Sequence, residues 1–331
     1  MVVKIGLIGI GSIGKFHLRH SLQLPGAELV AVADVSRGAR KYAQNHGAPK
    51  VYESFKEMLS NEDLDAVVIS LPHFLHCPVA TFCAEAGKDI FLEKPLARTI
   101  HEGRKIVKAA KQNKVKLMVN YHLRFNKTMN YFKEVIDDGR IGSIATMSAE
   151  WVGGGPFEHT MKPIPEWYFD VKKVGGGALI DWGGHIIDLS TYFFGKQPSV
   201  LYSCIRSRLR LPFEDEAILI LEFNTGTKVI IHVGWFSQIA RKNVTLWGTV
   251  RAISWEDYIE KTDYIKAFRN IIRKLRGRQV MPLFEFGLSH LKALEHFINC
   301  VSAGKEPSIT GDDALEDLKI ISKAYKISKR F

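Results

Sequence analysis

The chain has 331 residues, of which 46% are apolar and 24% are charged. This composition excludes a disordered, collagen-like or coiled-coil protein, and the length predicts two domains. The 46 basic and 35 acidic residues leave a net charge of +11, which favours an anionic partner such as a phosphorylated or carboxylated small molecule.

Five short apolar runs alternate with helical patterns in the first part of the chain. We predict strands over residues 3–10, 28–33, 65–71, 89–92 and 115–120. Nearly continuous Val/Ile runs are typical of parallel strands that are covered on both faces. Residues 1–121 are therefore predicted to form an α/β Rossmann domain with a doubly wound parallel sheet.

The second part predicts strands that follow one another with few helices between them. Strands are expected over 143–152, 199–210, 216–223, 228–236 and 244–246, and helices over 127–138, 186–194, 264–275, 284–302 and 312–327. Asn224-Thr225-Gly226 is typical of a hairpin turn. Residues 122–331 are therefore predicted to form an α+β domain with a large open, mostly antiparallel sheet.

The cysteines and the apolar runs bear on location. The four cysteines form no CxxC pair, so the sequence predicts neither a disulfide scaffold nor a metal site and favours a reducing compartment. Residues 1–7 are typical of a strand and not of a signal peptide. No uninterrupted apolar run approaches the ~18 residues of a membrane-spanning helix. We therefore expect a cytoplasmic protein.

Residues 9–14 form the pattern G-x-G-x-x-G directly after the first predicted strand and at the start of a helical pattern. Gly9 permits a tight turn, Gly11 lets the backbone approach a pyrophosphate, and Gly14 lets helix and strand pack closely. Asp34 ends the second predicted strand, where a carboxylate binds ribose hydroxyls and repels a 2′-phosphate. The pattern predicts NAD, while the guanidinium of Arg37 keeps NADP open. The alternative is a plain glycine turn with Asp34 as a helix cap. The dinucleotide contacts predicted from these segments are Gly9, Gly11, Ser12, Ile13, Gly14, Asp34 and Arg37.

Two further segments carry chemically active side chains. Lys94, in Glu93-Lys94-Pro95, follows a predicted strand, and ligands bind beyond the carboxyl ends of strands in open parallel sheets. A solvated lysine is the alternative. Asp181 and His185 follow three glycines at 175–177 and, in a helix, lie one turn apart on the same face. They form either a catalytic pair or a buried structural salt bridge.

Together, these segments resemble the Gfo/Idh/MocA oxidoreductase family. The resemblance rests on the glycine turn with Asp34, on Glu93-Lys94-Pro95, and on the glycine-rich segment with Asp181 and His185, in this order along essentially the whole chain. A fourth, looser match is the segment 70–76, which is similar to the family's stretch beside the nicotinamide. It has Ser70-Leu71 where many members have threonine, and His73 where they have asparagine.

The resemblance implies a dehydrogenase that acts on a secondary alcohol of a sugar or cyclitol, with Lys94, Asp181 and His185 as the catalytic set. The chemistry agrees, because an imidazole can take the hydroxyl proton near neutral pH and an ammonium group can stabilise the developing alkoxide. The family also implies that the open sheet forms a homodimer or homotetramer. The cofactor contacts that the resemblance adds are Ser70, Leu71, Pro72, His73, His76, Glu93 and Lys94.

Two residues extend the predicted substrate site beyond Lys94, Asp181 and His185. Arg124 lies in a segment that is similar to a family segment beside substrate and cofactor, where it either holds an anionic group or joins the two domains. Trp167 lies in a Pro- and Gly-rich loop over 153–177. It either stacks on a sugar face or packs in a core.

Residues 261–278 carry seven basic residues and one acidic residue. Apolar residues at helical spacing within this segment predict an amphipathic helix with its cations on the opposite face. That face is solvated, makes a weak membrane-surface contact with anionic lipid, or binds a phosphorylated substrate. No DNA-reading motif accompanies the charge, so we expect no nucleic-acid partner.

Within the family, residues 174–189 and the basic segment resemble members that act on nucleotide-activated amino sugars. This resemblance implies a UDP-N-acetylglucosamine 3-dehydrogenase type of enzyme. A myo-inositol or neutral-sugar dehydrogenase, which needs no basic patch, is the alternative. A regulator that senses NAD(P) without catalysis and redox-assisted glycoside cleavage are further interpretations; the retention of Lys94, Asp181 and His185 disfavours the regulator.

Overall fold

The computed structural model describes residues 2–157, 164–195, 197–259 and 283–330. The chain divides into two compact units, one of Met1–His122, Lys172–Gly175 and Gly287–Leu318, the other of Leu123–Val171, Gly176–Phe286 and Lys319–Phe331. The first unit thus includes residues that a division at 121 assigns to the second domain, and the domain boundaries 1–121 and 122–331 stay a prediction. The predicted helix over 264–275 lies outside the described residues.

A six-stranded sheet forms the centre of the first unit, in the order β3-β2-β1-β4-β5-β6. Every neighbouring pair is parallel. This order is that of a Rossmann fold and confirms the predicted doubly wound sheet. The strands are β1 (Val3–Ile8), β2 (Ala27–Ala33), β3 (Val51–Tyr52), β4 (Ala66–Ile69), β5 (Asp89–Glu93) and β6 (Leu117–Asn120).

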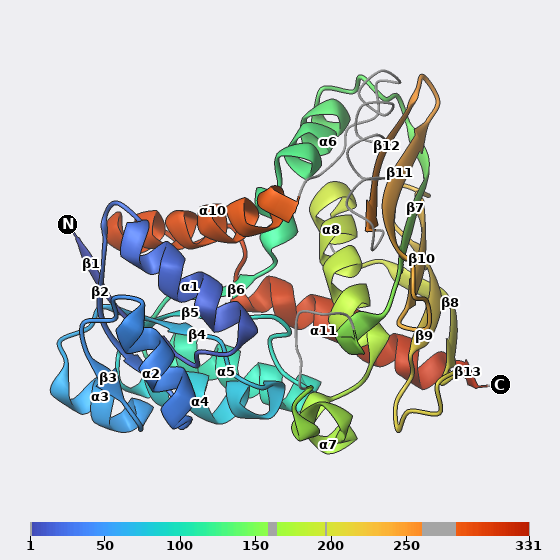
Figure 1. Cartoon of the computed structure of the whole chain (residues 1–331). Coiled ribbons are helices and arrows are strands. Elements are labelled where there is room, and N and C mark those ends of the chain that lie inside the picture. The colour runs from blue at the N-terminus through green and yellow to red at the C-terminus, as the bar shows by residue number, and fades with distance from the viewer. Residues whose placement is uncertain (1, 158–163, 196, 260–282, 331) are drawn as a thin grey trace. The chain divides into compact units, whose positions relative to one another are not determined.

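Helices cover both faces of this sheet (Figure 1). Phe91 of β5 contacts His17 of α1 and Phe297 of α10, with ring centroids 5.6 and 5.5 Å apart, so these two helices share one face. Helices α4 and α5 pack against each other on the opposite face. The helices are α1 (Ser12–Gln23), α2 (Arg37–Asn45), α3 (Phe55–Asn61), α4 (His73–Glu85), α5 (Ile100–Gln112), α10 (Leu283–Ser302) and α11 (Gly311–Ile327), which runs from the first unit into the second.

The second unit contains a seven-stranded sheet in the order β12-β11-β7-β10-β9-β8-β13. The β10–β7 and β13–β8 pairs are parallel and the remaining pairs are antiparallel. The predicted open, mostly antiparallel sheet is therefore confirmed. The strands are β7 (Ile144–Val152), β8 (Ser199–Arg206), β9 (Glu216–Glu222), β10 (Lys228–Gly234), β11 (Ala240–Gly248), β12 (Ala252–Ile259) and β13 (Lys329–Arg330).

One face of this sheet is covered by helices. A π-helical turn over Leu179–Gly183 leads into α8 (Gly184–Phe194). A Cβ on Gly183 would lie 3.7 Å from Val233 of β10, so the turn packs directly on the sheet. Phe132 of α6 (Lys127–Asp137) contacts Phe193 of α8. No helix among residues 2–157, 164–195, 197–259 and 283–330 combines the length and the apolar character needed to cross a membrane.

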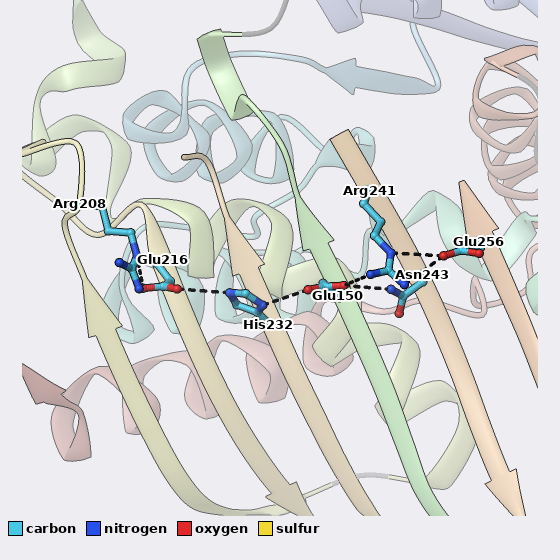
Figure 2. Close-up of polar contacts among 7 residues, drawn as sticks. All are labelled: Glu150, Arg208, Glu216, His232, Arg241, Asn243 and Glu256. Carbon is cyan, nitrogen blue, oxygen red and sulfur yellow. Dashed lines mark hydrogen bonds and ion pairs between the residues drawn. The ribbon is translucent and has the colours of Figure 1, made fainter. Parts of the chain in front are cut away.

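The other face of the sheet carries a row of charged and polar side chains across five strands, β9, β10, β7, β11 and β12, with Arg208 from the loop after β8 at one end (Figure 2). His232 lies at its centre, with each ring nitrogen 3.3 Å from a carboxylate, that of Glu150 on one side and that of Glu216 on the other. Arg241 bridges Glu150 and Glu256 at one end. We call this set the polar row; its members are Arg208, Glu216, His232, Glu150, Arg241, Asn243 and Glu256.

Candidate active site

The glycine turn joins β1 to α1 and brings the backbone close to the end of β4. Gly9 has a φ of 94°, and a Cβ at this position would lie 2.2 Å from the carbonyl oxygen of Ser70. A Cβ on Gly14 would lie 2.1 Å from the carbonyl oxygen of Gly9. Both contacts are with backbone atoms, so only glycine is accommodated at these two positions.

Gly11 is different, because a Cβ there would meet nothing within 4 Å. It is the N-cap of α1, with a φ of −71°, no side chain caps this end, and the first turn contains no acidic residue. The N–H groups of a helix N-terminus and the helix dipole favour an anion. The space beside Gly11 and the uncapped end of α1 therefore fit the pyrophosphate of NAD.

Asp34 lies at the carboxyl end of β2 and is hydrogen-bonded to this turn. Its Oδ2 accepts the N–H of Ile10 at 2.7 Å, and its Oδ1 accepts the N–H of Ser36 at 2.8 Å. Ser36, and not Asp34, caps α2 through its hydroxyl group. The alternative in which Asp34 is the helix cap is therefore wrong. Arg37 is exposed at the first position of α2.

The segment 70–76 contains the link from β4 to α4 and the first turn of α4, and Ser70 lies beside the glycine turn. Both ring nitrogens of the buried His76 lie near carbonyl oxygens, that of Pro95 at 2.8 Å and that of Leu71 at 2.9 Å. Burial lowers the pKa of His76. The Nδ1 of His73 lies 2.8 Å from the carbonyl oxygen of Val174. The two contacts of His76 hold the loops at the ends of β4 and β5 together, and that of His73 joins α4 to residue 174. The cofactor contacts of Ser70, Leu71, Pro72, His73 and His76 stay predictions.

Lys94 follows β5 directly, is half-buried, and precedes a cis peptide bond to Pro95. Its neighbour Glu93 is buried and accepts hydrogen bonds from His17 at 2.6 Å and Asn120 at 2.7 Å. Burial alone raises the pKa of Glu93, but the hydrogen bond and the charge of His17 oppose it and bring this pKa to about 2. Glu93 is thus a carboxylate that is hydrogen-bonded to buried protein groups. Its cofactor contact stays a prediction.

The protein is expected to lose stability in acid through two groups of the first unit. The pKa of Glu93 is lowered to about 2, and burial together with His17 and His290 lowers the pKa of His20 to about 4. Both pKa values lie below those of the unfolded chain. The free energy of unfolding should therefore fall between about pH 6.5 and 4 because of His20, and between about pH 4.5 and 2 because of Glu93. Glu93 accounts for about 3 kcal/mol of this loss; His20 contributes less, because solvent screens its exposed part.

Urea unfolding at a series of pH values between 7 and 3 checks this expectation. The Glu93→Gln variant, which cannot ionise at this position, should lose less stability over the acidic half of that range. An unfolding free energy that falls equally steeply in both proteins would show that Glu93 does not cause the acid sensitivity.

In the second unit, Glu214 anchors the segment that carries the other predicted catalytic residues. Its buried Oε1 accepts the N–H groups of Gly177 and Leu179 at 2.9 and 3.0 Å and the hydroxyl group of Tyr325 at 2.7 Å. A Cβ on Gly177 would lie 1.8 Å from the carbonyl oxygen of Glu214. Glycine is therefore required at position 177, because this segment passes directly over the backbone of residue 214.

Asp181 and His185 follow this anchor and lie on successive turns. Asp181 is in the π-helical turn and accepts a hydrogen bond from the hydroxyl group of Tyr168 at 3.1 Å. Burial and the charge of Asp181 raise the pKa of Tyr168 well above its usual value, so this phenol is a neutral donor. His185 is 6% exposed, and its ring lies 5.7 Å from that of Trp151.

Tyr168 was not predicted as a site residue, although its neighbour Trp167 was. The ring of Trp167 is half-exposed and lies 5.1 Å from that of Tyr168. The pairing of Tyr168 with Asp181 depends on a loop that folds back on the helix, and no spacing rule reveals it. Tyr168 therefore joins the candidate site through contact with Asp181, and stacking of Trp167 on a sugar stays a prediction.

Arg124 makes a two-pronged ion pair with Asp188 of α8. Its Nε and Nη2 lie 3.0 and 2.6 Å from Oδ1 of this fully buried carboxylate. The guanidinium also lies over the ring of Tyr192, 5.3 Å from its centroid. This geometry supports a structural role for Arg124 within the second unit, because Asp188 would otherwise be a buried charge without its cation.

The fold and these sites define a class, that of oxidoreductases with an NAD-binding Rossmann domain. Residues 3–121 match the model of the oxidoreductase family GFO_IDH_MocA with its NAD-binding Rossmann fold, and residues 129–254 match the GFO/IDH/MocA C-terminal domain. The chain therefore belongs to the Gfo/Idh/MocA family. The predictions of this family, of NAD as cofactor and of a dehydrogenase acting on CH–OH groups are confirmed.

Curated relatives and solved structures are similar over nearly the whole chain. Myo-inositol 2-dehydrogenase of Thermotoga maritima is 24% identical, with 94% of this chain and 92% of that protein covered. The scyllo-inositol 2-dehydrogenase (NAD(+)) of Bacillus subtilis is 27% identical, with 96% and 92% covered. The WlbA dehydrogenase from Bordetella pertussis, in complex with NADH and UDP-GlcNAcA, shares the fold with a TM-score of 0.82 at 24% identity, over 98% of this chain and 94% of that one.

Proposed function

We propose that the protein transfers hydride between NAD and a secondary alcohol of a sugar-type ring, with Lys94, Asp181 and His185 acting on one carbinol. The proposal rests on two features, each observed within one unit. Lys94 stands at the carboxyl end of β5 in the NAD-binding unit, and Asp181 and His185 lie one turn apart on the glycine-anchored helix of the second unit. Such an amine, imidazole and carboxylate are the groups that alcohol oxidation requires.

Each residue has a distinct task in this proposal. NAD, when bound at the glycine turn and Asp34, supplies the hydride acceptor. The Nδ1 of His185 is buried, so we assign Nε2 to take the proton of the substrate hydroxyl group. The Nζ of Lys94 donates a hydrogen bond to the same oxygen and stabilises its developing charge. Asp181, oriented by Tyr168, accepts a hydrogen bond from a neighbouring substrate hydroxyl group.

We further propose a nucleotide-activated amino sugar of the UDP-N-acetylglucosamine type as the substrate. The net charge of +11 supports an anionic substrate, and the WlbA structure is a complex with NADH and UDP-GlcNAcA. The basic segment 261–278 lies outside the described residues, so its part in substrate or membrane binding stays a prediction. A cyclitol is the second candidate, because relatives named inositol dehydrogenases cover more than nine-tenths of the chain.

A substrate screen tests these proposals. NADH formation is measured with UDP-N-acetylglucosamine, its uronic acid, myo-inositol, scyllo-inositol and free sugars, with NADP in parallel. We expect turnover with a UDP-sugar and NAD, and none in His185→Ala. Turnover with cyclitols alone would contradict the proposed UDP-sugar substrate and favour a cyclitol dehydrogenase. NAD binding without turnover of any alcohol would favour the regulator, and release of a monosaccharide without net NADH would favour glycoside cleavage.

We also propose that the sheet face bearing the polar row is the surface on which copies of the chain associate. Apolar side chains accompany the polar row there, with Ile230 41% and Trp247 55% exposed. Light scattering coupled to size-exclusion chromatography should give the mass of a dimer or tetramer, and a monomer would contradict the proposal.

We also propose a cytoplasmic location, which the unpaired cysteines favour.

A further inference from the structure

A buried histidine connects the NAD-binding helix to the segment that carries Lys94. His17 lies on α1, three residues after Gly14, and its side chain is 0% exposed. Its Nε2 lies 2.6 Å from Oε1 of Glu93, whereas its Nδ1 has no hydrogen-bond partner among the described residues. The bond to Glu93 is therefore the one polar contact found for this ring in the described part of the chain.

The Oε1 of Glu93 joins helix α1 to the ends of strands β5 and β6. Glu93 is the last residue of β5, and its Oε1 also accepts the side-chain N–H of Asn120, the last residue of β6, at 2.7 Å. The pKa of Glu93 is about 2, so the group is charged at neutral pH. A buried charge with two short bonds has little freedom to move, because any displacement breaks a contact that water cannot replace.

We propose that His17 is a positioning residue for Lys94: the bond from α1 to Glu93 fixes the backbone from which the lysine side chain extends. The proposal rests on the proposed role of Lys94 in catalysis. It also means that the helix whose N-terminus receives the pyrophosphate and the strand end that carries the lysine are held as one body. A hydrophobic residue of similar size would pack against Phe91 equally well, so packing alone does not call for a histidine.

Three variants separate positioning from simple stabilisation. His17→Leu removes the bond and leaves the charge of Glu93 buried without its partner. His17→Gln keeps an N–H donor close to the former Nε2. The double variant His17→Leu/Glu93→Gln removes both the bond and the buried charge, so its thermal midpoint should recover toward that of the wild type. His20→Gln is the matched control, because His20 lies on the same helix and has no bond to Glu93 in the described residues.

We expect His17→Leu and the double variant to lower kcat by about 10- to 100-fold, since a misplacement of about 1 Å is enough for such a loss. The dissociation constant of NAD, measured by fluorescence, should stay within about 3-fold of wild type, because the glycine turn is untouched. His17→Gln and His20→Gln should retain most of kcat. Recovery of kcat together with stability in the double variant would show a merely structural role and overturn the proposal.

Crystal structures of the variants with NAD provide a readout that does not depend on activity. Lys94 Nζ should be displaced by about 1 Å or spread over several rotamers in His17→Leu and in the double variant, and should remain in place in His17→Gln. An unmoved Lys94 in His17→Leu overturns the proposal. Unchanged turnover in Lys94→Ala would instead contradict the proposed function, while the position of the lysine would still decide the role of His17.

Discussion

Replacing Lys94 with alanine is expected to lower kcat by about 10³-fold, which is typical for the loss of one charge-stabilising donor. In the proposed reaction, the ammonium group stabilises an oxygen that becomes negative as its proton leaves. Removing it should raise the barrier without changing the glycine turn or Asp34, the proposed contacts of the dinucleotide. Steady-state kinetics should therefore show a low kcat, and fluorescence titration should show an NAD affinity close to that of the wild type.

Lys108→Ala is the matched control for this experiment. Lys108 is an exposed lysine on α5 of the same unit, so its replacement should leave kcat unchanged. Addition of methylammonium should restore part of the activity of Lys94→Ala, because a small amine can occupy the space of the missing group. A Lys94→Ala enzyme that retains a tenth or more of wild-type kcat would remove Lys94 from the mechanism.

Gly11→Ala is expected to abolish tight NAD binding while leaving the protein as stable as the wild type. The backbone of Gly11 has a φ of −71°, which alanine adopts freely, and its Cβ would meet no protein atom within 4 Å. The added methyl group would instead occupy the space that the pyrophosphate needs beside α1. We expect the dissociation constant of NAD to rise by about 100-fold, since the backbone could no longer approach the phosphates.

Gly14→Ala is the contrasting variant. Its Cβ would lie 2.1 Å from the carbonyl oxygen of Gly9, so the clash is with the protein itself. Urea unfolding without NAD should show a loss of about 1–3 kcal/mol, the usual range for overpacking. If Gly11→Ala binds NAD as well as the wild type does, the pyrophosphate does not lie at this turn. If Gly14→Ala is as stable as the wild type, the close contact with Gly9 is not a constraint.

Much of the fold could be predicted because its signals are local. The Val/Ile runs of β1, β2 and β4 and the glycines at 9–14 identify a parallel sheet and its nucleotide-binding turn without any knowledge of distant contacts. The short strand β3 was missed, because two residues carry no periodicity. Strand β12 was missed as well, and β11 is longer than predicted, because pairing with neighbouring strands extends both beyond their apolar residues.

The candidate site likewise has residues that could be predicted from the sequence and partners that could not. Lys94, Asp181 and His185 could be proposed from short motifs, since each motif combines a reactive side chain with glycine or proline in its immediate neighbourhood. The partners of these motifs could not be predicted. Glu214 lies 37 residues from Gly177, and Asp188 lies 64 residues from Arg124, so no spacing rule connects them. The sequence left two interpretations of Arg124, an anion contact or a residue that joins the two domains, and it did not reveal the buried carboxylate of Asp188 in the same unit.

Sequence patterns alone were enough to predict the class of protein, most of its strands and helices, and a set of candidate catalytic residues, because hydrophobic period and glycine geometry are properties of consecutive residues. How the candidate reactive groups are supported became clear from the three-dimensional arrangement. The link from His17 to Glu93 spans 76 residues, and the contact between Tyr168 and Asp181 requires a loop to fold back onto a helix. Hydrogen bonds and burial depend on distance in space, and distance in space is set by packing of the whole unit.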